Sequence, residues 1–390
     1  MPFYRQLGEI PHKRHTQFRR PDGGLYAEEL QGEEGFSSDS SLLYHRHLPT
    51  AITAAEAVER EPRETVPNHP LKPRHFRTHA LKVGGDLVDS RQLLMGNGDV
   101  RLSYVAADAP SPLYRNAVGD ECVYIESGSA TLESVYGRLD VGQGDYVVVP
   151  TSCIHRWVPT GEQPVRALVV EAVGGAGHIT PPDRYLSKRG QFLEHSPYCE
   201  RDLRGPAELI EPDEDGETDV LVAHRDGWTR YTYARHPFDL VGWDGCLYPY
   251  AFNIADFEPI TGRIHQPPPV HQTFAGPGFV VCSFVPRKFD YHPQSIPAPY
   301  NHANVDSDEM IFYCGGDFTS RKGAGIELGS ISLHPGGFTH GPQPGSVEAS
   351  IGAEGTDELA VMVDTFRPLH FGAAALETED VGYAWSWAGG

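Results

Sequence analysis

Short apolar runs, separated by glycine and proline, dominate the pattern of hydrophobic and polar positions. Typical runs are CVYIESGSATLESV from Cys122, GDYVVVP from Gly144, GFVVCSFVP from Gly278 and EMIFYCGG from Glu309. They are rich in Val, Ile, Tyr and Phe, which fit a pleated and half-buried strand. The 42 Gly and 33 Pro residues mark turns between such strands. The pattern therefore predicts a mainly β protein.

Helical periodicity is confined to short stretches, such as AITAAEAVEREP from Ala51, so helices should be a minor component. The segment from 175 to 235 contains the run GPAELIEPDEDGETD, whose Asp, Glu and Pro residues predict a connecting loop. At about 150 residues per domain, a chain of 390 residues suggests two or three structural units, of which we favour two. We place their boundary between 1–235 and 236–390.

An internal repeat supports this division. In each half a glutamate is followed at the same interval by a glycine, as Glu121 by Gly128 and Glu309 by Gly316. A Gly–Pro–His set then recurs at an offset of 185 positions, and its members are Gly144, Pro150 and His155 in the first half and Gly329, Pro335 and His340 in the second. Such a repeat indicates two copies of one structural unit.

The spacing resembles the two signature motifs of the cupin superfamily, whose small β-barrels are jelly rolls. In those motifs the Glu and the first Gly lie on one hairpin, and the Pro and His lie on another. The resemblance implies a bicupin, with two jelly-roll barrels and minor helices. The N-terminal unit would hold an arm, a degenerate barrel and the connecting loop.

The second copy carries a complete set of candidate metal ligands. The cupin pattern has His-x-His before the glutamate, and here His302 is present while Asn304 replaces the second histidine. The remaining set is His302, Glu309 and His340, two imidazoles and one carboxylate, as in the facial triad of non-haem Fe(II) oxygenases. Zinc, nickel and manganese stay open, because affinity alone does not select iron. The plainer alternative is two loop histidines and a surface acid.

The first copy lacks part of this ligand set. It keeps Glu121 and His155, but SPLYRNAVG stands where the His-x-His would fall. We therefore expect a metal-free first barrel, with a weak second metal site as the alternative.

Charge and composition exclude some partners. The chain has 32 Lys and Arg against 53 Asp and Glu, a net charge of −21, which argues against nucleic acid because phosphates must be neutralised. The six cysteines show no C-x-x-C pair and are expected to be reduced thiols. With no apolar leader and no run of about 18 apolar residues, we expect a soluble, cytoplasmic protein without a membrane partner.

Two segments at the candidate metal site, PYNHANVDSDEMIFYCGGDF and SLHPGGFTHGPQPGSVEAS, resemble the iron-binding segments of homogentisate 1,2-dioxygenases. The resemblance extends to LYAEEL, SLLYHRHLP and FDLVGWDGCLYPYAFNIADF, and so covers most of the chain. It implies the same ligands, Fe(2+) as cofactor, and O2-dependent cleavage of homogentisate to maleylacetoacetate in tyrosine and phenylalanine breakdown. By analogy it also implies a homo-oligomer, a hexamer.

The resemblance further implies a catalytic base on the segment that enters the second barrel. His265 in GRIHQPPPVHQTF matches best, and His271 is its rival. Phe318 stands where the family commonly has a substrate-contacting Tyr, so the substrate is less determined than the reaction class. Candidate substrate contacts are Tyr300, Tyr313, Phe318, Arg321 as a source of positive charge, and His334, which is also a candidate for orienting the ligands.

Two other functions remain open from the sequence. One is a cupin dioxygenase for another para-diol, such as gentisate or a substituted hydroquinone. The other, of a different class, is a non-enzymatic bicupin for binding or storage, which needs no intact triad.

Overall fold

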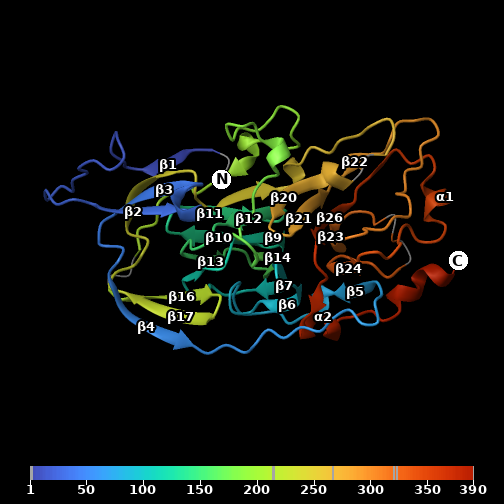
Figure 1. Cartoon of the computed structure of the whole chain (residues 1–390), viewed down its shortest axis with the longest axis horizontal. Coiled ribbons are helices and arrows are strands. Elements are labelled where there is room, and N and C mark those ends of the chain that lie inside the picture. Colours follow the sequence, from blue (N-terminus) through green and yellow to red (C-terminus); the bar gives the residue numbers. More distant parts are fainter. Residues whose placement is uncertain (1–2, 213–215, 266–267, 319–320, 322–323, 390) are drawn as a thin grey trace.

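The structure is a computed structural model that describes residues 3–212, 216–265, 268–318, 321 and 324–389. Its strands form two bodies that lie side by side along the long axis, the second in orange and red (Figure 1). The α-helices of the described residues are short, α1 (Ser346–Ser350) and α2 (Ala373–Glu377). The prediction of a mainly β fold with minor helices is confirmed.

Two sheets form the first barrel. The seven-stranded sheet has the order β11 (Gly137–Gly142), β10 (Ser129–Ser134), β13 (His155–Pro159), β8 (Tyr114–Asn116), β16 (Thr218–His224), β17 (Gly227–Tyr233), β4 (Ile52–Val58). The eight-stranded sheet has the order β15 (Leu203–Arg204), β19 (Tyr250–Asn253), β12 (Asp145–Val149), β9 (Glu121–Ser127), β14 (Val165–Ala172), β7 (Val100–Ala107), β6 (Gln92–Gly96), β27 (His370–Phe371).

A six-stranded sheet forms most of the second barrel. Its order is β20 (Gln272–Gly276), β21 (Phe279–Phe284), β26 (Leu359–Thr365), β23 (Asp308–Gly315), β24 (Ser330–His334), β5 (Arg74–Arg77). A two-stranded sheet lies beside it, β22 (Arg287–Lys288) and β25 (Gly355–Thr356). The N-terminal arm forms a four-stranded sheet in the order β1 (Arg5–Gly8), β18 (Leu240–Gly245), β3 (Ser40–His45), β2 (Ala27–Gly32).

Short 3-10 helices complete the described structure. They are η1 (Glu34–Phe36), η2 (Thr78–Ala80), η3 (Asp183–Tyr185), η4 (Glu200–Asp202), η5 (Ile254–Asp256), η6 (Pro268–His271) and η8 (Tyr383–Gly389). Within the described ranges, no helix is long and apolar enough to cross a membrane. All six cysteines are unpaired, as expected.

The repeated glycines terminate equivalent strands. Gly128 follows β9 and Gly316 follows β23, with φ of 83° and 77°. A Cβ atom at Gly316 would collide with the backbone oxygen of Asp357. Only glycine reaches this backbone conformation without steric cost, so the repeat marks two matching turns.

Two local expectations were wrong. The stretch from Ala51 forms strand β4 instead of a helix, because it pairs along its length with β17 and such pairing outweighs local propensity. The expected connecting loop contains the hairpin β16–β17, which adds two strands to the first barrel.

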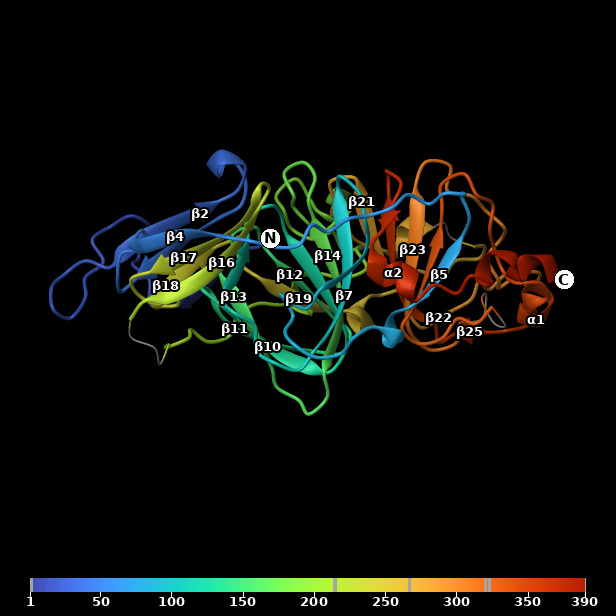
Figure 2. The ribbon, with the colours of Figure 1, turned by 90° about the horizontal axis from the view of Figure 1, so that it is seen from below.

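Strands cross the expected domain boundary in both directions. β5 pairs with β24 in the second barrel, and Figure 2 shows it among the orange strands. β18 and β19, from beyond residue 236, pair with strands of the first half. Phe312 of β23 packs its ring 6.0 Å from that of Tyr104, within one continuous apolar core. The boundary at 235/236 stays a prediction, but the two barrels share strands and core.

Candidate active site

The second barrel brings the three predicted ligands together. Glu309 lies at the start of β23, while His302 and His340 lie in loops joined by a reciprocal backbone bridge. The two N–H···O distances of this bridge are 2.8 and 2.9 Å. One ligand atom from each side chain lies within 4.8 Å of the other two. The spacing in the sequence thus becomes a compact N, N, O cluster.

Local hydrogen bonds orient both imidazoles. Nδ1 of His302 lies 3.0 Å from the carbonyl oxygen of Tyr300, and Nδ1 of His340 lies 3.0 Å from that of Phe338. Each Nδ1 therefore donates a proton, which leaves the Nε2 lone pair available as a ligand. Nε2 of His340 is buried without a hydrogen-bond partner among the described residues. A divalent cation at this position would satisfy it, so the residues fit the implied metal.

His334 makes a hydrogen bond with the carboxylate of Glu309. Its Nδ1 lies 2.9 Å from Oε1 of Glu309, and its Nε2 lies 3.0 Å from the hydroxyl of Tyr383. Burial and the nearby charge of Arg321 lower the pKa of His334 to about 3, so the ring is neutral. It then donates to Glu309 and accepts from Tyr383. Burial alone would raise the pKa of Glu309, but the surrounding imidazoles hold it well below its usual range.

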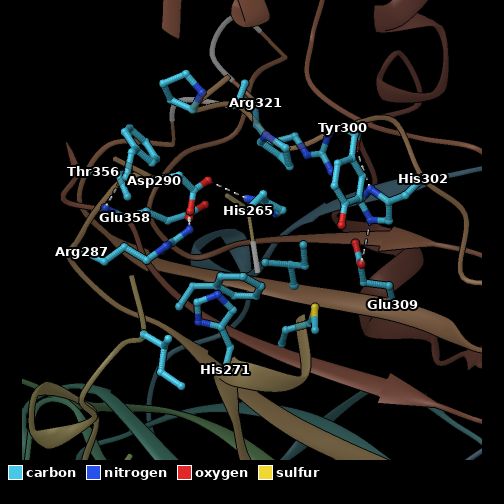
Figure 3. A pocket seen from close by; sticks show the side chains of 18 of the residues that line it. His265, His271, Arg287, Asp290, Tyr300, His302, Glu309, Arg321, Thr356 and Glu358 are labelled. Carbon is cyan, nitrogen blue, oxygen red and sulfur yellow. Dashed lines mark hydrogen bonds and ion pairs between the residues drawn. The ribbon is translucent and has the colours of Figure 1, made fainter. Parts of the chain in front are cut away.

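A cavity of about 320 Å³ opens beside these ligands. Figure 3 shows His302 and Glu309 at one end, Arg287 and Glu358 at the other, and His265 between them. The apolar side chains of Phe284, Ile311 and Met362 also line it. Its volume is at the lower end of the range for small-molecule sites, which suits a single aromatic ring.

His265 and His271 both line this cavity, but in different environments. Nδ1 of His265 lies 3.6 Å from a carboxylate oxygen of Asp290, and its ring is 5.1 Å from that of Tyr300. His271 is buried against Phe284, and burial together with Arg287 lowers the pKa of His271 to about 3. A ring that resists protonation is a poor proton acceptor, so the geometry favours His265.

The other predicted contacts divide into two groups. Tyr300 and Arg321 line the cavity, whereas Tyr313, Phe318 and His334 are not among its lining residues. The hydroxyl of Tyr313 is turned to Ser332 at 3.1 Å, and the ring of Phe318 packs against Tyr313 at 5.1 Å. The substrate contacts expected of these three residues stay predictions, and their present contacts lie elsewhere. The rings of Tyr313 and Phe318 pack on each other, and His334 makes a hydrogen bond with Glu309.

The polar far end of the cavity was not predicted from the sequence. Arg287 makes an ion pair with Glu358 at 3.1 Å, and Asp290 follows a few residues later. Pairing of β22 with β25 brings these segments together. Because Arg287 and Glu358 are far apart in the sequence, no motif contains both of them. The only sequence signal is the charged residues of VPRKFD, which interrupt an apolar run.

Asp364 was also missed. It is the cross-strand neighbour of Glu309, and Oδ1 accepts a long hydrogen bond of 3.4 Å from Asn304, the residue that replaces the second cupin histidine. Burial and the negative charge of Glu309 raise the pKa of Asp364 to about 8. The sequence signal for Asp364 was its position as a charged residue within the apolar segment LAVMVDT, which is typical of a buried strand.

An arginine takes the corresponding place in the first barrel. Arg91 donates to both carboxylate oxygens of Glu121, at 2.8 and 2.7 Å, and the side chains of Tyr114 and Asn116 donate to the same carboxylate. The guanidinium supplies the positive charge that a metal would bring. This arrangement supports the expectation of a metal-free first barrel, which stays a prediction.

A second group of potential ligands joins the arm to the first barrel, Glu33, Asp120 and His178. Nδ1 of His178 lies 3.4 Å from Glu33 and 3.7 Å from Asp120. The carboxylate of Asp120 already accepts hydrogen bonds from Thr151 and from the backbone of Ile179. An ion-pair contact between segments accounts for this group.

Comparison with known proteins places the chain in a family. The Cupin domain family matches residues 102–171, which form most of the first barrel. A protein of Saccharolobus solfataricus named "Putative dioxygenase" is 40% identical over 391 residues, covering 99% of each chain. The chain belongs to the cupin dioxygenase family. Membership makes this cupin dioxygenase an oxidoreductase.

More distant relatives of this cupin dioxygenase have named substrates. Homogentisate 1,2-dioxygenase of Caenorhabditis elegans is 26% identical over 85% of this chain and 79% of its own length. The enzyme of the same name from Rhodopseudomonas palustris is 27% identical over 86% of this chain and 78% of its own length. The resemblance inferred from the metal-site segments is thereby confirmed at the level of the family.

Proposed function

We propose that this protein is an Fe(II)-dependent ring-cleaving dioxygenase that converts homogentisate and O2 to maleylacetoacetate, in tyrosine and phenylalanine breakdown. The observation that carries the proposal is the meeting of His302, Glu309 and His340 at one end of a cavity sized for one aromatic ring. Iron(II) held there supplies open coordination positions and Lewis-acid polarisation of a bound phenol. Both oxygen atoms of O2 enter the product.

The other residues around the cavity accept a proton, pack against the substrate and hold Glu309 in place. His265 accepts the proton of a substrate hydroxyl, and Asp290, 3.6 Å from its Nδ1, orients the ring. Phe284, Ile311 and Met362 pack against the faces of the substrate ring and exclude water. His334 keeps the carboxylate of Glu309 in place through its Nδ1–H at 2.9 Å.

The proposal is tested by oxygen uptake. The protein is loaded with Fe(II) without oxygen, and uptake is followed with homogentisate, gentisate and methylhydroquinone, with mass spectrometry of the products. We expect one O2 consumed per homogentisate and a product heavier by two oxygen atoms. Turnover of gentisate or methylhydroquinone but not homogentisate would reassign the substrate. An iron-loaded protein that consumes no O2 with any para-diol would support the binding or storage alternative.

Three further expectations belong to this proposal. Hexameric assembly is proposed by analogy with the family that the metal-site segments resemble, a cytoplasmic location from the composition of the chain, and iron as the metal from the ligand set. The negative net charge of −21 supports a small substrate over nucleic acid.

A further inference from the structure

One cation of the cavity, Arg321, makes no direct ion pair among the described residues, although the negative charge of Glu309 favours its charged form. Arg321 lines the cavity but is only 5% exposed. Its Nη1 donates to the carbonyl oxygen of Gly341, and its guanidinium lies 5.7 Å from the ring centroid of Trp387. Its Nε is buried without a partner, and no ion pair to Arg321 is found among the described residues. Burying an unpaired charge is costly, so the site is built for an anion.

Two other arginines among the described residues are buried like Arg321, Arg74 and Arg91, and both are neutralised within the chain, Arg74 by Glu379 at 2.8 Å. Arg287, at the far end of the same cavity, is paired with Glu358 at 3.1 Å. Arg91 in the first barrel is paired with Glu121 at 2.7 Å. Lys288 also lines the cavity, but it is exposed and can be solvated. The unpaired state of Arg321 is therefore a specific feature of the end of the cavity near the metal ligands.

The position of Arg321 matches the geometry of an acidic para-diol. Its Nη1 contacts Gly341, the neighbour of the candidate ligand His340, and both Arg321 and Tyr300 line the cavity. In homogentisate and gentisate the acidic substituent is ortho to one hydroxyl. When that hydroxyl is held at the metal ligands, the carboxylate lies beside them and the para hydroxyl points into the cavity. His265 lies in that direction.

We propose that Arg321 binds the substrate carboxylate and restricts the enzyme to para-diols that carry an acid ortho to the metal-bound hydroxyl. This inference rests on the proposed function and adds the determinant of its specificity. Arginine suits the role because its charge is permanent and two of its N–H groups match a carboxylate. A chain of net charge −21 repels anions at long range, so such local positive charge is required.

The test compares two phenols that differ by the acid and are not para-diols, 2-hydroxyphenylacetate and 2-methylphenol. Their affinities for the iron-loaded protein are measured by calorimetry without oxygen. We expect the wild type to bind the acid roughly ten- to hundredfold more tightly, as for a hydrogen-bonded charge pair. Arg321→Gln should abolish this ratio and Arg321→Lys should keep part of it. Arg287→Gln, the matched control, should keep the ratio because that charge is already paired.

Equal binding of the two phenols by the wild type would overturn the inference whatever the variants do. So would an Arg321→Gln protein that keeps its iron and still prefers the acid, or loss of the preference in Arg287→Gln alone. If Arg321→Gln does not fold by circular dichroism, the wild type and Arg321→Lys decide. Because binding is measured without turnover, a protein that prefers the acid but never consumes O2 would contradict the proposed function and leave the anion site standing.

Discussion

The two candidate ligand histidines are oriented by the same short-range contact. In each, Nδ1 faces the carbonyl oxygen of the residue two positions earlier, Tyr300 for His302 and Phe338 for His340, at 3.0 Å. This contact depends on the local turn and on nothing distant. The spacing of the motifs therefore predicts the candidate ligand residues. The local turns at these residues then leave Nε2 as the nitrogen that each imidazole offers to a metal.

At the same scale, the two histidines of the cavity predict opposite results. His265→Ala should retain iron and lower kcat by roughly 10²–10⁴-fold, as is typical for the loss of a general acid or base. His271→Ala should change kcat far less, because burial has already lowered the pKa of His271 to about 3. Steady-state oxygen uptake by both variants, with iron content as control, checks this. A defect confined to His271→Ala would show that the base is His271.

Other residues of the site could not be predicted from spacing. Arg287 and Glu358 meet only because β22 pairs with β25. Tyr313 and Phe318 are close to the metal motif in sequence, yet their rings pack on each other at 5.1 Å outside the lining of the cavity. Proximity in sequence predicts a shared element, whereas lining a cavity depends on which face of that element is open.

At the scale of elements, turn glycines were the most reliable signal. Gly128 and Gly316 mark equivalent turns because both need positive φ, which few other residues adopt. The stretch from Ala51 contains good helix formers, but its partner β17 decides its conformation. The hairpin β16–β17 turns at Arg225 and Asp226, just before Gly227 begins β17, and the acidic composition of the preceding run concealed this turn signal.

The sheet of the arm contains a pH-sensitive contact. On β3, His45 makes hydrogen bonds with Asp239 at 2.6 Å, next to β18, and with Glu29 of β2 at 2.9 Å. Burial alone would lower the pKa of His45, but the hydrogen bonds and charges of these two carboxylates raise it to about 9. The protonated imidazole thus stabilises the pairing of three strands.

Because the folded pKa of His45 lies above its ordinary value of 6.5, this stabilisation is complete below the unfolded pKa and is lost as pH rises through about 9. We expect the wild type to lose up to about 3 kcal/mol of unfolding free energy over that window relative to His45→Gln. Urea denaturation of both proteins across the window measures it. A difference between them that does not change with pH would contradict the assignment.

At the scale of the whole molecule, the repeat predicted two barrels but not how they exchange strands. β5 completes the sheet of the second barrel, and β27 adds to the first. Such pairings join residues far apart in sequence, and short strands such as RHFR carry too little pattern to assign a partner. The absence of a His-x-His from the first copy was visible in the sequence, whereas the pairing of Glu121 with Arg91 was not, because Arg91 lies outside the motifs.

The proposed activity depends on one metal centre, in the second barrel. The most direct measurement is the iron content per chain of the wild type, His340→Ala and His155→Ala after anaerobic loading, with circular dichroism to confirm folding. We predict one iron per chain in the wild type and in His155→Ala, because Arg91 and not a metal neutralises Glu121, and almost none in His340→Ala, because the cluster loses one of its three ligands. Equal loss of iron from both variants, or full retention by His340→Ala, would contradict the account.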